Sequence, residues 1–599
     1  ESSEDGIWFG TSKPDDSKGA LIYDTYTLAE QRCDSNKGMD LLTFEVKVYK
    51  DSVLIQVGTL TDDAIEIGTT ALDAETGTHM SQPAKEVTIE DVVEYEGLKK
   101  GQKYKLTGTL MDKKTGEPIL VDEKPVISET EFTAKKSSGS VKVTFTFDAT
   151  SLKGKTTVVF EELYQDEMQL AVHTDINDED QTIYFPEIKT TAKDADTNSN
   201  ISCAKEEITL VDTVSFKGLV PNQKYEVTGT LIDKETKKPV EADGKPVTAK
   251  ASFKPKESAG TVDVTFTFDA SSLKGKTVVV FESLAYKDKE VAVHTDIADE
   301  GQTIYFPEIK TTATDAASGT HYAKPEKELT LTDLVEYKNL IPGKEYKLTG
   351  TLMDAETEKP FDVDGKAVTA ETSFTPEEAN GSVELSFTFD ASALSGKTLV
   401  AFETMTFEDH EVAVHADIKD ANQTIYFPEI KTTAKDGSDG DQDVSASKEA
   451  TIVDTVTYYG LMPGSEYKVI GTLMNKETGE ALLKDGKPVT AQAEFRAEKA
   501  GGSVEVTFTF DASALAGQDV VVFEKLYYTD GKTEHEIASH EDLKDEGQTV
   551  HMTELSKEPE TPPVAPPVKT GDETPLLLSA GTAIAALAGA SVLGIVYFK

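Results

Sequence analysis

One ten-residue pattern occurs four times in this chain, each time near the end of a longer repeat. It reads HTDINDEDQT at 173–182, HTDIADEGQT at 294–303, HADIKDANQT at 415–424 and HEDLKDEGQT at 540–549. The glutamines of the pattern are separated by 121, 121 and 125 residues. A period this long and regular is typical of an array of similar domains. Because the polar residues of the pattern recur while other stretches of the repeats differ, we expect chemistry that is local to each domain.

The repeats have the two-residue period of β-strands. The run VTFTF, at 143–147, 264–268 and 506–510, alternates apolar residues with threonine, as a half-buried strand does. Short strands of this kind, turn signals such as Thr115–Gly116 and the lack of a long helical stretch predict an all-β fold. We therefore predict tandem immunoglobulin-like β-sandwich domains at 65–185, 186–306, 307–427 and 428–553. Residues 1–64 are predicted to be the C-terminal part of a preceding β domain.

Composition excludes several classes of function. A formal net charge of −48 argues against nucleic acid as a partner, because nucleic-acid binding requires basic patches. The two cysteines, Cys33 and Cys203, lie in different units, which argues against an internal disulfide. Asp175, Asn177 and Asp180 lack the spacing, glycine and terminal glutamate of a calcium loop. We predict no metal and no cofactor.

Strand alternation places polar residues on apolar faces. In the second repeat, ITLVDTVSF puts an aspartate in the middle of an apolar face, and the opening strand IKTTA turns its first threonine inward. The apolar run VVVFE ends in a glutamate, and a histidine lies eight residues before the glutamine. Each repeat therefore offers a hydroxyl, a carboxamide, two desolvated acids and an imidazole, which in the second repeat are Thr190, Gln302, Asp212, Glu282 and His294.

Two interpretations of these five residues remain open. One is a buried polar network that fixes the strand register, since buried polar groups usually satisfy one another. The other is an acyl transfer inside the domain, in which the threonine hydroxyl attacks the glutamine carbonyl, ammonia leaves and an ester remains. In that interpretation the histidine takes the threonine proton and an acid with a raised pKa donates a hydrogen bond to the carbonyl oxygen. Adjacent opening and closing strands would hold the reactants together.

The motifs IxTTA, (I/V)xxxDxV, V(V/A)FE and HxDxxDxxQT together resemble the VaFE repeat, or Thr-Gln ester-bond, domains of Gram-positive surface proteins. The resemblance covers about 65–553 and occurs four times. It implies a collagen-adhesin B-type sandwich in which a Thr-Gln ester forms autocatalytically. The implied pairs are Thr69–Gln181, Thr190–Gln302, Thr311–Gln423 and Thr432–Gln548. The implied assisting residues are Asp91, Glu161, His173, Asp212, Glu282, His294, Asp333, Glu403, His415, Asp454, Glu524 and His540. The adjacent threonines are the alternative: Thr70, Thr191, Thr312 and Thr433.

The composition changes after the fourth repeat. Residues 557–575 are proline-rich, as in a stiff spacer, and Leu576–Phe598 is an uncharged span long enough for a membrane helix, which needs about 20 residues. PVKTGD, this span and the final Lys599 together resemble a sortase sorting signal. The resemblance implies cleavage between Thr570 and Gly571, with sortase, peptidoglycan and, before sorting, the membrane as partners.

These observations predict a secreted stalk of an adhesin, anchored to the cell wall of a Gram-positive bacterium. The repeats would cross-link themselves without turnover, and a preceding region would bind a host ligand. Three alternatives are a pilus subunit that sortase polymerises, repeats that bind a host ligand directly, and an enzyme acting on outside substrates. The last is disfavoured because the candidate groups face inward and four similar copies suit a structural role.

Overall fold

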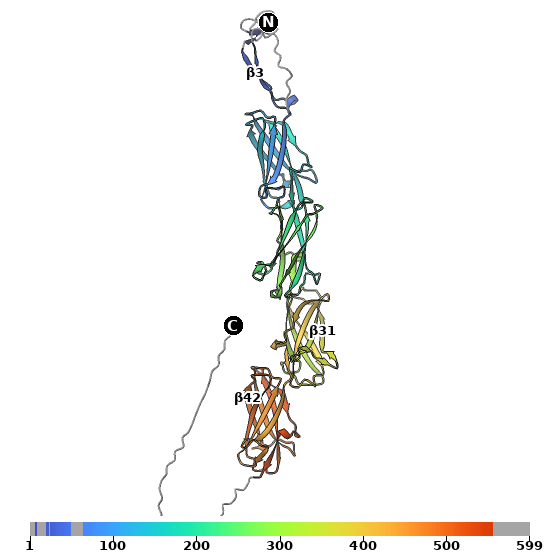
Figure 1. The fold of residues 1–599 in the computed structure, drawn as a ribbon, viewed down its shortest axis with the longest axis vertical. Helices are drawn as coiled ribbons and strands as arrows, with labels where there is room; N and C mark the ends of the chain where they lie inside the picture. Colours follow the sequence, from blue (N-terminus) through green and yellow to red (C-terminus); the bar gives the residue numbers. More distant parts are fainter. Residues whose placement is uncertain (1–5, 9–19, 23, 49–63, 555–599) are drawn as a thin grey trace, which may run out of the picture.

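The protein has 599 residues, and its computed structural model describes residues 6–8, 20–22, 24–48 and 64–554. Four β-sheet units follow one another along the long axis of the molecule (Figure 1). We call them repeats 1 to 4 in chain order. Within the described ranges, no helix is long and apolar enough to cross a membrane. The predicted spacer, the sorting motif with Thr570 and Gly571, and the predicted helix at 576–598 lie outside the described residues.

Repeat 2 illustrates the plan of all four, which is two antiparallel sheets facing each other. The first sheet is β15-β16-β21, and the second is β20-β17-β22-β23 with β24 also paired to β22. Its elements are β15 (Glu187–Asp194), β16 (Ile208–Lys217), β17 (Tyr225–Asp233), β18 (Glu241–Ala242), β19 (Lys245–Pro246), β20 (Thr248–Phe253), β21 (Gly260–Phe268), η4 (Ser271–Leu273), β22 (Thr277–Tyr286), β23 (Lys289–His294), η5 (Glu300–Gln302) and β24 (Thr303–Tyr305).

The other repeats use equivalent elements in the same order. Repeat 1 comprises β5 (Glu66–Asp73), β6 (Val87–Glu96), β7 (Lys103–Asp112), β8 (Leu120–Val121), β9 (Lys124–Pro125), β10 (Ile127–Thr133), β11 (Gly139–Phe147), η3 (Thr150–Leu152), β12 (Lys155–Gln165), β13 (Met168–His173) and β14 (Thr182–Phe185). Repeat 3 comprises β25 (Glu308–Asp315), β26 (Leu329–Lys338), β27 (Tyr346–Asp354), β28 (Lys359–Pro360), β29 (Asp362–Val363), β30 (Lys366–Ala367), β31 (Thr369–Phe374), β32 (Gly381–Phe389), β33 (Thr398–Phe407), β34 (His410–His415), η6 (Ala421–Gln423) and β35 (Thr424–Tyr426).

Repeat 4 differs by one added strand at its C-terminal end. It comprises β36 (Glu429–Asp436), β37 (Asp443–Ser445), β38 (Ala450–Tyr459), β39 (Glu466–Asn475), β40 (Leu483–Lys484), β41 (Lys487–Pro488), β42 (Thr490–Arg496), β43 (Gly502–Phe510), β44 (Asp519–Thr529), β45 (Glu534–His540), η7 (Glu546–Gln548) and β46 (Thr549–Thr553). The added strand, β37, pairs in parallel with β46. The other pairings within the two main sheets of repeat 4 are antiparallel.

The N-terminal segment is also built from strands. β3 (Thr25–Ala29) pairs with β4 (Thr43–Lys47), and η2 (Asp34–Asn36) lies between them. β1 (Gly6–Trp8) pairs with β2 (Ala20–Ile22). This segment reaches repeat 1 through a bridge between Met39 and Ala64 and a 2.8 Å hydrogen bond from the Ile65 amide to the Gly38 carbonyl.

Each repeat has its own core, made by the inward faces of its two sheets. The alternation in β16 places the same five residues inward that the sequence predicts: Ile208, Leu210, Asp212, Val214 and Phe216 are all buried. The core of repeat 2 also contains Val227 and Leu231 from the opposite sheet. Burial of such aliphatic side chains drives the two sheets together. An aspartate thus occupies the centre of an otherwise apolar face.

The opening strand and the closing strand of each repeat lie side by side, although they belong to different sheets. β15 is an edge strand of the first sheet, and it contacts β23 and β24 at the edge of the second. In repeat 1, the Ala71 amide of the opening strand donates to the Asp180 carbonyl at 2.9 Å. Strand alternation also predicts that Gln302 lies on the closing strand, on one face with Ile304 and Phe306, and the structure corrects this expectation. Gln302 does not lie on the closing strand itself, because it ends the 3-10 turn η5, one residue before β24 begins.

Candidate functional site

The threonine and the aspartate of each repeat come from neighbouring strands of the first sheet. In repeat 1, Thr69 lies on β5 and Asp91 on the central strand β6, and both side chains are buried. Ala71 pairs with Asp91 across the two strands, which sets the threonine two residues away on the same face. The Thr69 hydroxyl donates a hydrogen bond to Oδ1 of Asp91. In repeat 1, Asp91 is therefore the hydrogen-bond acceptor of the threonine hydroxyl.

The glutamate and the glutamine come from the second sheet and meet the threonine across the core. In repeat 2, the Gln302 amide nitrogen lies 2.5 Å from Oε2 of Glu282 and 3.0 Å from Oγ1 of Thr190. Repeat 4 has the same arrangement, with 2.9 Å from Gln548 to Glu524 and 3.1 Å from Gln548 to Thr432. The four glutamines have no exposed surface: Gln181, Gln302, Gln423 and Gln548.

Repeats 1 and 3 bring the same groups together with fewer hydrogen bonds. In repeat 3, the Gln423 amide nitrogen lies 2.5 Å from Oε2 of Glu403, while the Thr311 hydroxyl is buried and has no hydrogen-bond partner in the described part of the chain. In repeat 1, Gln181 and Glu161 are fully buried. The hydroxyl, the carboxamide and the two acids are thus buried in every repeat, and among the described residues hydrogen bonds join the threonine to the glutamine in repeats 2 and 4.

The structure distinguishes the two adjacent threonines. The first of each pair is buried, with exposed fractions of 4–8% for Thr69, Thr190, Thr311 and Thr432. The second points away from the core and is exposed in all four repeats: Thr70, Thr191, Thr312 and Thr433. Only the first threonine has its hydroxyl inside the site.

The four glutamine carbonyl oxygens are buried without a hydrogen-bond partner among the described residues: Oε1 of Gln181, Gln302, Gln423 and Gln548. A buried carbonyl oxygen left unpaired costs about 1–3 kcal/mol. A polar network whose purpose is to fix strand register would satisfy its own members. Repetition of the same unpaired atom in four sites therefore favours the reactive interpretation over the register-fixing one.

The two acids of each site have raised pKa values. Burial raises the pKa of Glu161, Glu282 and Glu403 to about 10, and the neighbouring aspartate adds to the shift because two carboxylates repel. The pKa of Glu524 is raised for the same two reasons. Burial also raises the pKa of each aspartate, Asp91, Asp212, Asp333 and Asp454. At neutral pH the glutamate is therefore a proton donor, and in repeat 1 the hydrogen bond from Thr69 favours the ionised form of Asp91.

The histidine sits at the half-buried rim of the site, and the structure changes the role expected for it. Nε2 of His173 lies 2.7 Å from Oδ2 of Asp178, and Nδ1 lies 3.2 Å from the Ile67 carbonyl oxygen. Both ring nitrogens face oxygen atoms. We expected the histidine to take the threonine proton, but the Thr69 hydroxyl donates to Asp91 instead. His173 contributes its charge, which favours the ionised form of Asp91.

The sequence analysis quoted the second aspartate of HxDxxDxxQT but gave it no function. The pKa of Asp299 is lowered overall. Burial raises it, but the hydrogen bonds from His294 and the Gly301 amide lower it by more. Its Oδ2 lies 2.9 Å from His294, and its Oδ1 accepts from the Gly301 amide at 2.7 Å, which caps the turn η5. Its carbonyl accepts from the Thr303 hydroxyl at 2.7 Å.

One aspartate therefore orients the histidine and shapes the turn that presents Gln302. Its equivalents in the other repeats are Asp178, Asp420 and Asp545. Their signal in the sequence is a fixed position, five residues after the histidine and three before the glutamine.

A glycine opposite the glutamate makes room for the site, and the sequence analysis missed it too. Gly229 pairs with Glu282 across β17 and β22. A Cβ atom on Gly229 would lie 2.5 Å from Cζ of Phe266, which reaches across from the first sheet. The glycine therefore leaves the space that the Phe266 ring occupies in the core. The equivalents are Gly108, Gly350 and Gly471.

Within the described ranges, no group of three or more His, Cys, Asp or Glu side chains could hold a metal ion.

The sequence matches the T-Q ester bond containing domain four times, at 65–185, 186–306, 307–427 and 428–552. The protein belongs to this family. Together the four matches cover well over half of the chain. The name of this family contains the two residue types, threonine and glutamine, that the structure joins by a hydrogen bond in repeats 2 and 4.

Comparison with solved structures gives matches of low overall similarity. A Mobiluncus mulieris adhesin with disulfide, isopeptide and ester cross-links is 16% identical, with 36% of this chain and 80% of that chain covered and a TM-score of 0.18. Three N-terminal domains of the outer capsid protein Hoc of bacteriophage RB49 are 12% identical, with 62% and 100% covered and a TM-score of 0.26. No protein in the curated set matches the chain. The family assignment therefore rests on the domain match.

Proposed function

We propose that each repeat closes an intramolecular ester between the first threonine of its opening strand and the glutamine before its closing strand. The observation that carries this proposal is the contact in repeat 2, where the Gln302 amide lies 3.0 Å from the Thr190 hydroxyl inside a closed core. Reactants held this closely replace a bimolecular encounter, which lowers the barrier by several kcal/mol, about 7–11 in well-oriented cases.

The reaction uses the two acids as a pair. The aspartate takes the hydroxyl proton of the threonine, and Oγ1 attacks the carboxamide carbon of the glutamine. The protonated glutamate, whose pKa is raised to about 10 in Glu282, gives its proton to the amide nitrogen, which leaves as ammonia. The C–N bond breaks as the C–O bond forms, and the aspartate then returns its proton to the glutamate. The acids end as they began, so each bond forms once and no outside substrate turns over.

Intact mass of the full chain tests this proposal. We expect the mass of the sequence minus four molecules of ammonia, and minus three for Thr190→Ala. The matched control is Thr191→Ala, which removes the exposed neighbour and should leave all four losses. Hydroxylamine should cleave the esters, whereas cross-links that resist it would be amides. A mass equal to that of the unmodified sequence would leave only a polar network and end the proposal.

The function that this chemistry serves is mechanical. Thr190 and Gln302 are 112 residues apart, so an ester between them bypasses nearly the whole repeat. The opening and closing strands are also where the chain enters and leaves each repeat, and the units follow one another end to end (Figure 1). Tension along the chain would then pass through covalent bonds instead of unfolding the sheets.

We further propose that the chain is the stalk of an adhesin on the outside of a Gram-positive cell, with repeats of the immunoglobulin-like, collagen-adhesin B type. In each repeat a three-stranded sheet faces a sheet of five or six mainly antiparallel strands, which supports the fold class. The PVKTGD motif and the apolar span that follows support anchoring to peptidoglycan by a sortase. In a Gram-positive host, the chain should be released only by wall digestion, and changing Thr570 and Gly571 to alanine should move it to the membrane fraction. Lysine-linked oligomers in wall extracts would favour a pilus subunit instead.

A further inference from the structure

Each of the first three repeats places at least one apolar side chain outside its own core, and repeat 3 also places Tyr426 of its closing strand in the core of repeat 4. The loop after the opening strand carries Met80 in repeat 1, Ile201 in repeat 2 and Tyr322 in repeat 3, and these side chains are only 1–3% exposed. Met80 belongs to the core of repeat 2, Ile201 to the core of repeat 3, and Tyr322 to the core of repeat 4. We call these three side chains the joint residues.

The loop that carries a joint residue is fastened to the closing strand of its own repeat. In repeat 1, the Tyr184 amide donates to the His79 carbonyl at 2.8 Å, and the Ser81 amide donates to the Tyr184 carbonyl at 2.9 Å. Repeats 2 and 3 repeat this pair of bonds around Tyr305 and Tyr426. The Thr76 hydroxyl also donates to the Met80 carbonyl at 2.7 Å. The joint residue is therefore held by the closing strand, which directly follows the glutamine, and by the loop that follows the threonine-bearing opening strand.

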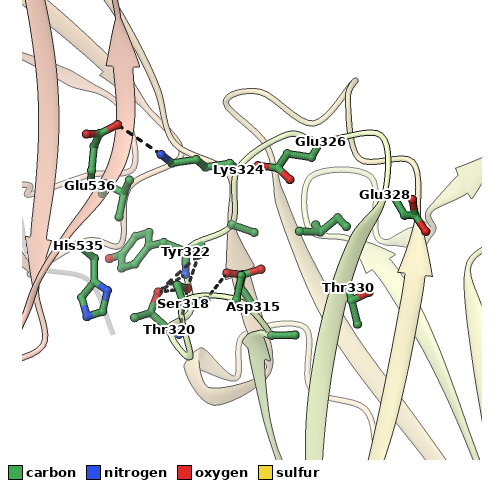
Figure 2. Close-up of a pocket in the computed structure, with 15 residues that line it drawn as sticks. Asp315, Ser318, Thr320, Tyr322, Lys324, Glu326, Glu328, Thr330, His535 and Glu536 are labelled. Carbon is green, nitrogen blue, oxygen red and sulfur yellow. Dashed lines mark hydrogen bonds and ion pairs between the residues drawn. The ribbon is translucent and has the colours of Figure 1, made fainter.

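The junction between repeats 3 and 4 is the most developed. The Tyr322 ring lies 4.7 Å from the ring of Tyr528, and its hydroxyl makes a 2.6 Å hydrogen bond with the hydroxyl of Tyr467, both in repeat 4. Residues of both repeats line a cavity of about 530 Å3 beside Tyr322, and Nζ of Lys324 in repeat 3 lies 3.3 Å from Oε1 of Glu536 in repeat 4. Figure 2 shows these residues and the Lys324–Glu536 ion pair. The tyrosine is the buried part of the contact, and the ion pair lies at its rim.

The fourth repeat uses the equivalent position differently. Val444 follows the opening strand of repeat 4 and is 1% exposed, but it belongs to the core of its own repeat together with Met552. β37, which carries Val444, pairs with β46, so the C-terminal end of repeat 4 is closed by its own residues. A terminal unit with an altered end is what an array needs where no further unit covers it.

We propose that Met80, Ile201 and Tyr322 each complete the core of the repeat that follows, so that repeats 2, 3 and 4 depend on the preceding repeat for part of their stability. The dependence has a direction, because the joint residue belongs in sequence to one repeat and in packing to the next. A substitution of Tyr322, which belongs to repeat 3, will therefore weaken repeat 4 more than repeat 3. Removing a buried aromatic ring leaves a cavity that the surrounding core fills only partly.

Hydrogen exchange on the full chain, read by mass spectrometry, tests this directional coupling. We expect Tyr322→Ala to speed exchange more than about tenfold in the repeat 4 strands β38 and β39, and little in the repeat 3 strands β26 and β27. Leu334→Ala is the matched control, since Leu334 is 41% exposed and also lies in repeat 3. Tyr322→Phe keeps the ring and should give an intermediate effect.

The measurement should be repeated with Thr432→Ala, because an ester in repeat 4 would limit how far that repeat can open. The packing of Tyr322 in repeat 4 does not require the ester, so the effect of Tyr322→Ala on exchange in repeat 4 should persist in the Thr432→Ala background. The effect should be larger there, because the ester no longer limits how far repeat 4 opens. Loss of protection throughout repeat 4, with repeat 3 still protected, would support the proposal even if repeat 4 no longer folds. Faster exchange in repeat 3 alone, or no change in repeat 4 in either background, would overturn it.

Discussion

The reactive site and the junction are both repeated along this chain, but they tolerate different amounts of variation. The site keeps the same residue types in all four repeats, down to the glycine opposite the glutamate. The joint position holds methionine, isoleucine and tyrosine in turn, and a valine that packs into its own repeat at the end of the array.

The difference follows from what each region requires of its side chains. Forming an ester requires a particular nucleophile, a particular leaving group and a proton donor, each at hydrogen-bond distance, and no other side chain supplies the same atoms. Filling the end of a core requires apolar volume, which several side chains supply with some repacking. Four predictions test this contrast, and we give them from the largest expected effect to the smallest.

Replacing Thr190 by valine should have the largest effect, because valine keeps the shape of threonine and removes the hydroxyl. Repeat 2 should then retain its ammonia and lose a covalent closure of 112 residues, worth about 4–5 kcal/mol by analogy with a disulfide. Intact mass and the denaturation midpoint of repeat 2 within the full chain measure the two results. Thr190→Ser keeps a hydroxyl and should still release ammonia; if it does not, the site requires more than the right atom.

The uncross-linked repeat should lose stability as pH rises. In the Thr190→Val variant, Glu282 keeps its proton in the folded state up to a pKa of about 10, against 4.5 when unfolded. The folded state then binds more protons between these values, so this contribution to its stability is complete below about 4.5 and is lost as the pH rises toward 10.

Denaturation of this variant at a series of pH values measures the slope. The control adds Glu282→Gln, whose neutral amide cannot titrate, and should flatten the profile. Parallel profiles for the two variants would mean that Glu282 is not protonated in the folded repeat.

Exchanging joint residues should cost little. Ile201→Met and Met80→Ile keep apolar volume, and volume-conserving changes of this kind usually cost less than about 1.5 kcal/mol. The loss should appear in the unfolding of repeat 3 for Ile201→Met and of repeat 2 for Met80→Ile. An exchange that costs as much as the loss of the ester would contradict the contrast between packing and chemistry.

The smallest effect should come from a lysine beside the site. Lys234 donates to the Thr303 hydroxyl at 3.3 Å, and Lys113 and Lys476 make the same contact in repeats 1 and 4. Repeat 3 has Ala355 at this position, yet it brings Gln423 and Glu403 together all the same. Lys234→Ala should therefore leave ammonia loss complete and change stability by no more than about 1 kcal/mol. Incomplete ammonia loss from repeat 2 would make the lysine part of the site.

The sequence analysis located much of the site because strand alternation is a local rule. The period of two predicted that Asp212 and Thr190 face inward, and both are buried. It was less successful where the chain leaves a regular strand. Gln302 ends a 3-10 turn, and the aspartate that caps this turn received no role from spacing alone. Side-chain capping depends on which amide the oxygen reaches, and a periodic pattern does not contain that information.

The sequence by itself determined the number of repeats, their all-β character and which polar side chains face inward, because these depend on period and composition. Only the tertiary structure decided that Asp91 accepts a hydrogen bond from Thr69, that Gly229 leaves space for Phe266, and that Tyr322 packs in the repeat after its own. These contacts join neighbouring strands of one sheet, strands of different sheets or residues of different repeats. Their geometry is set by how two faces pack in three dimensions, which the order of residues along one strand does not specify.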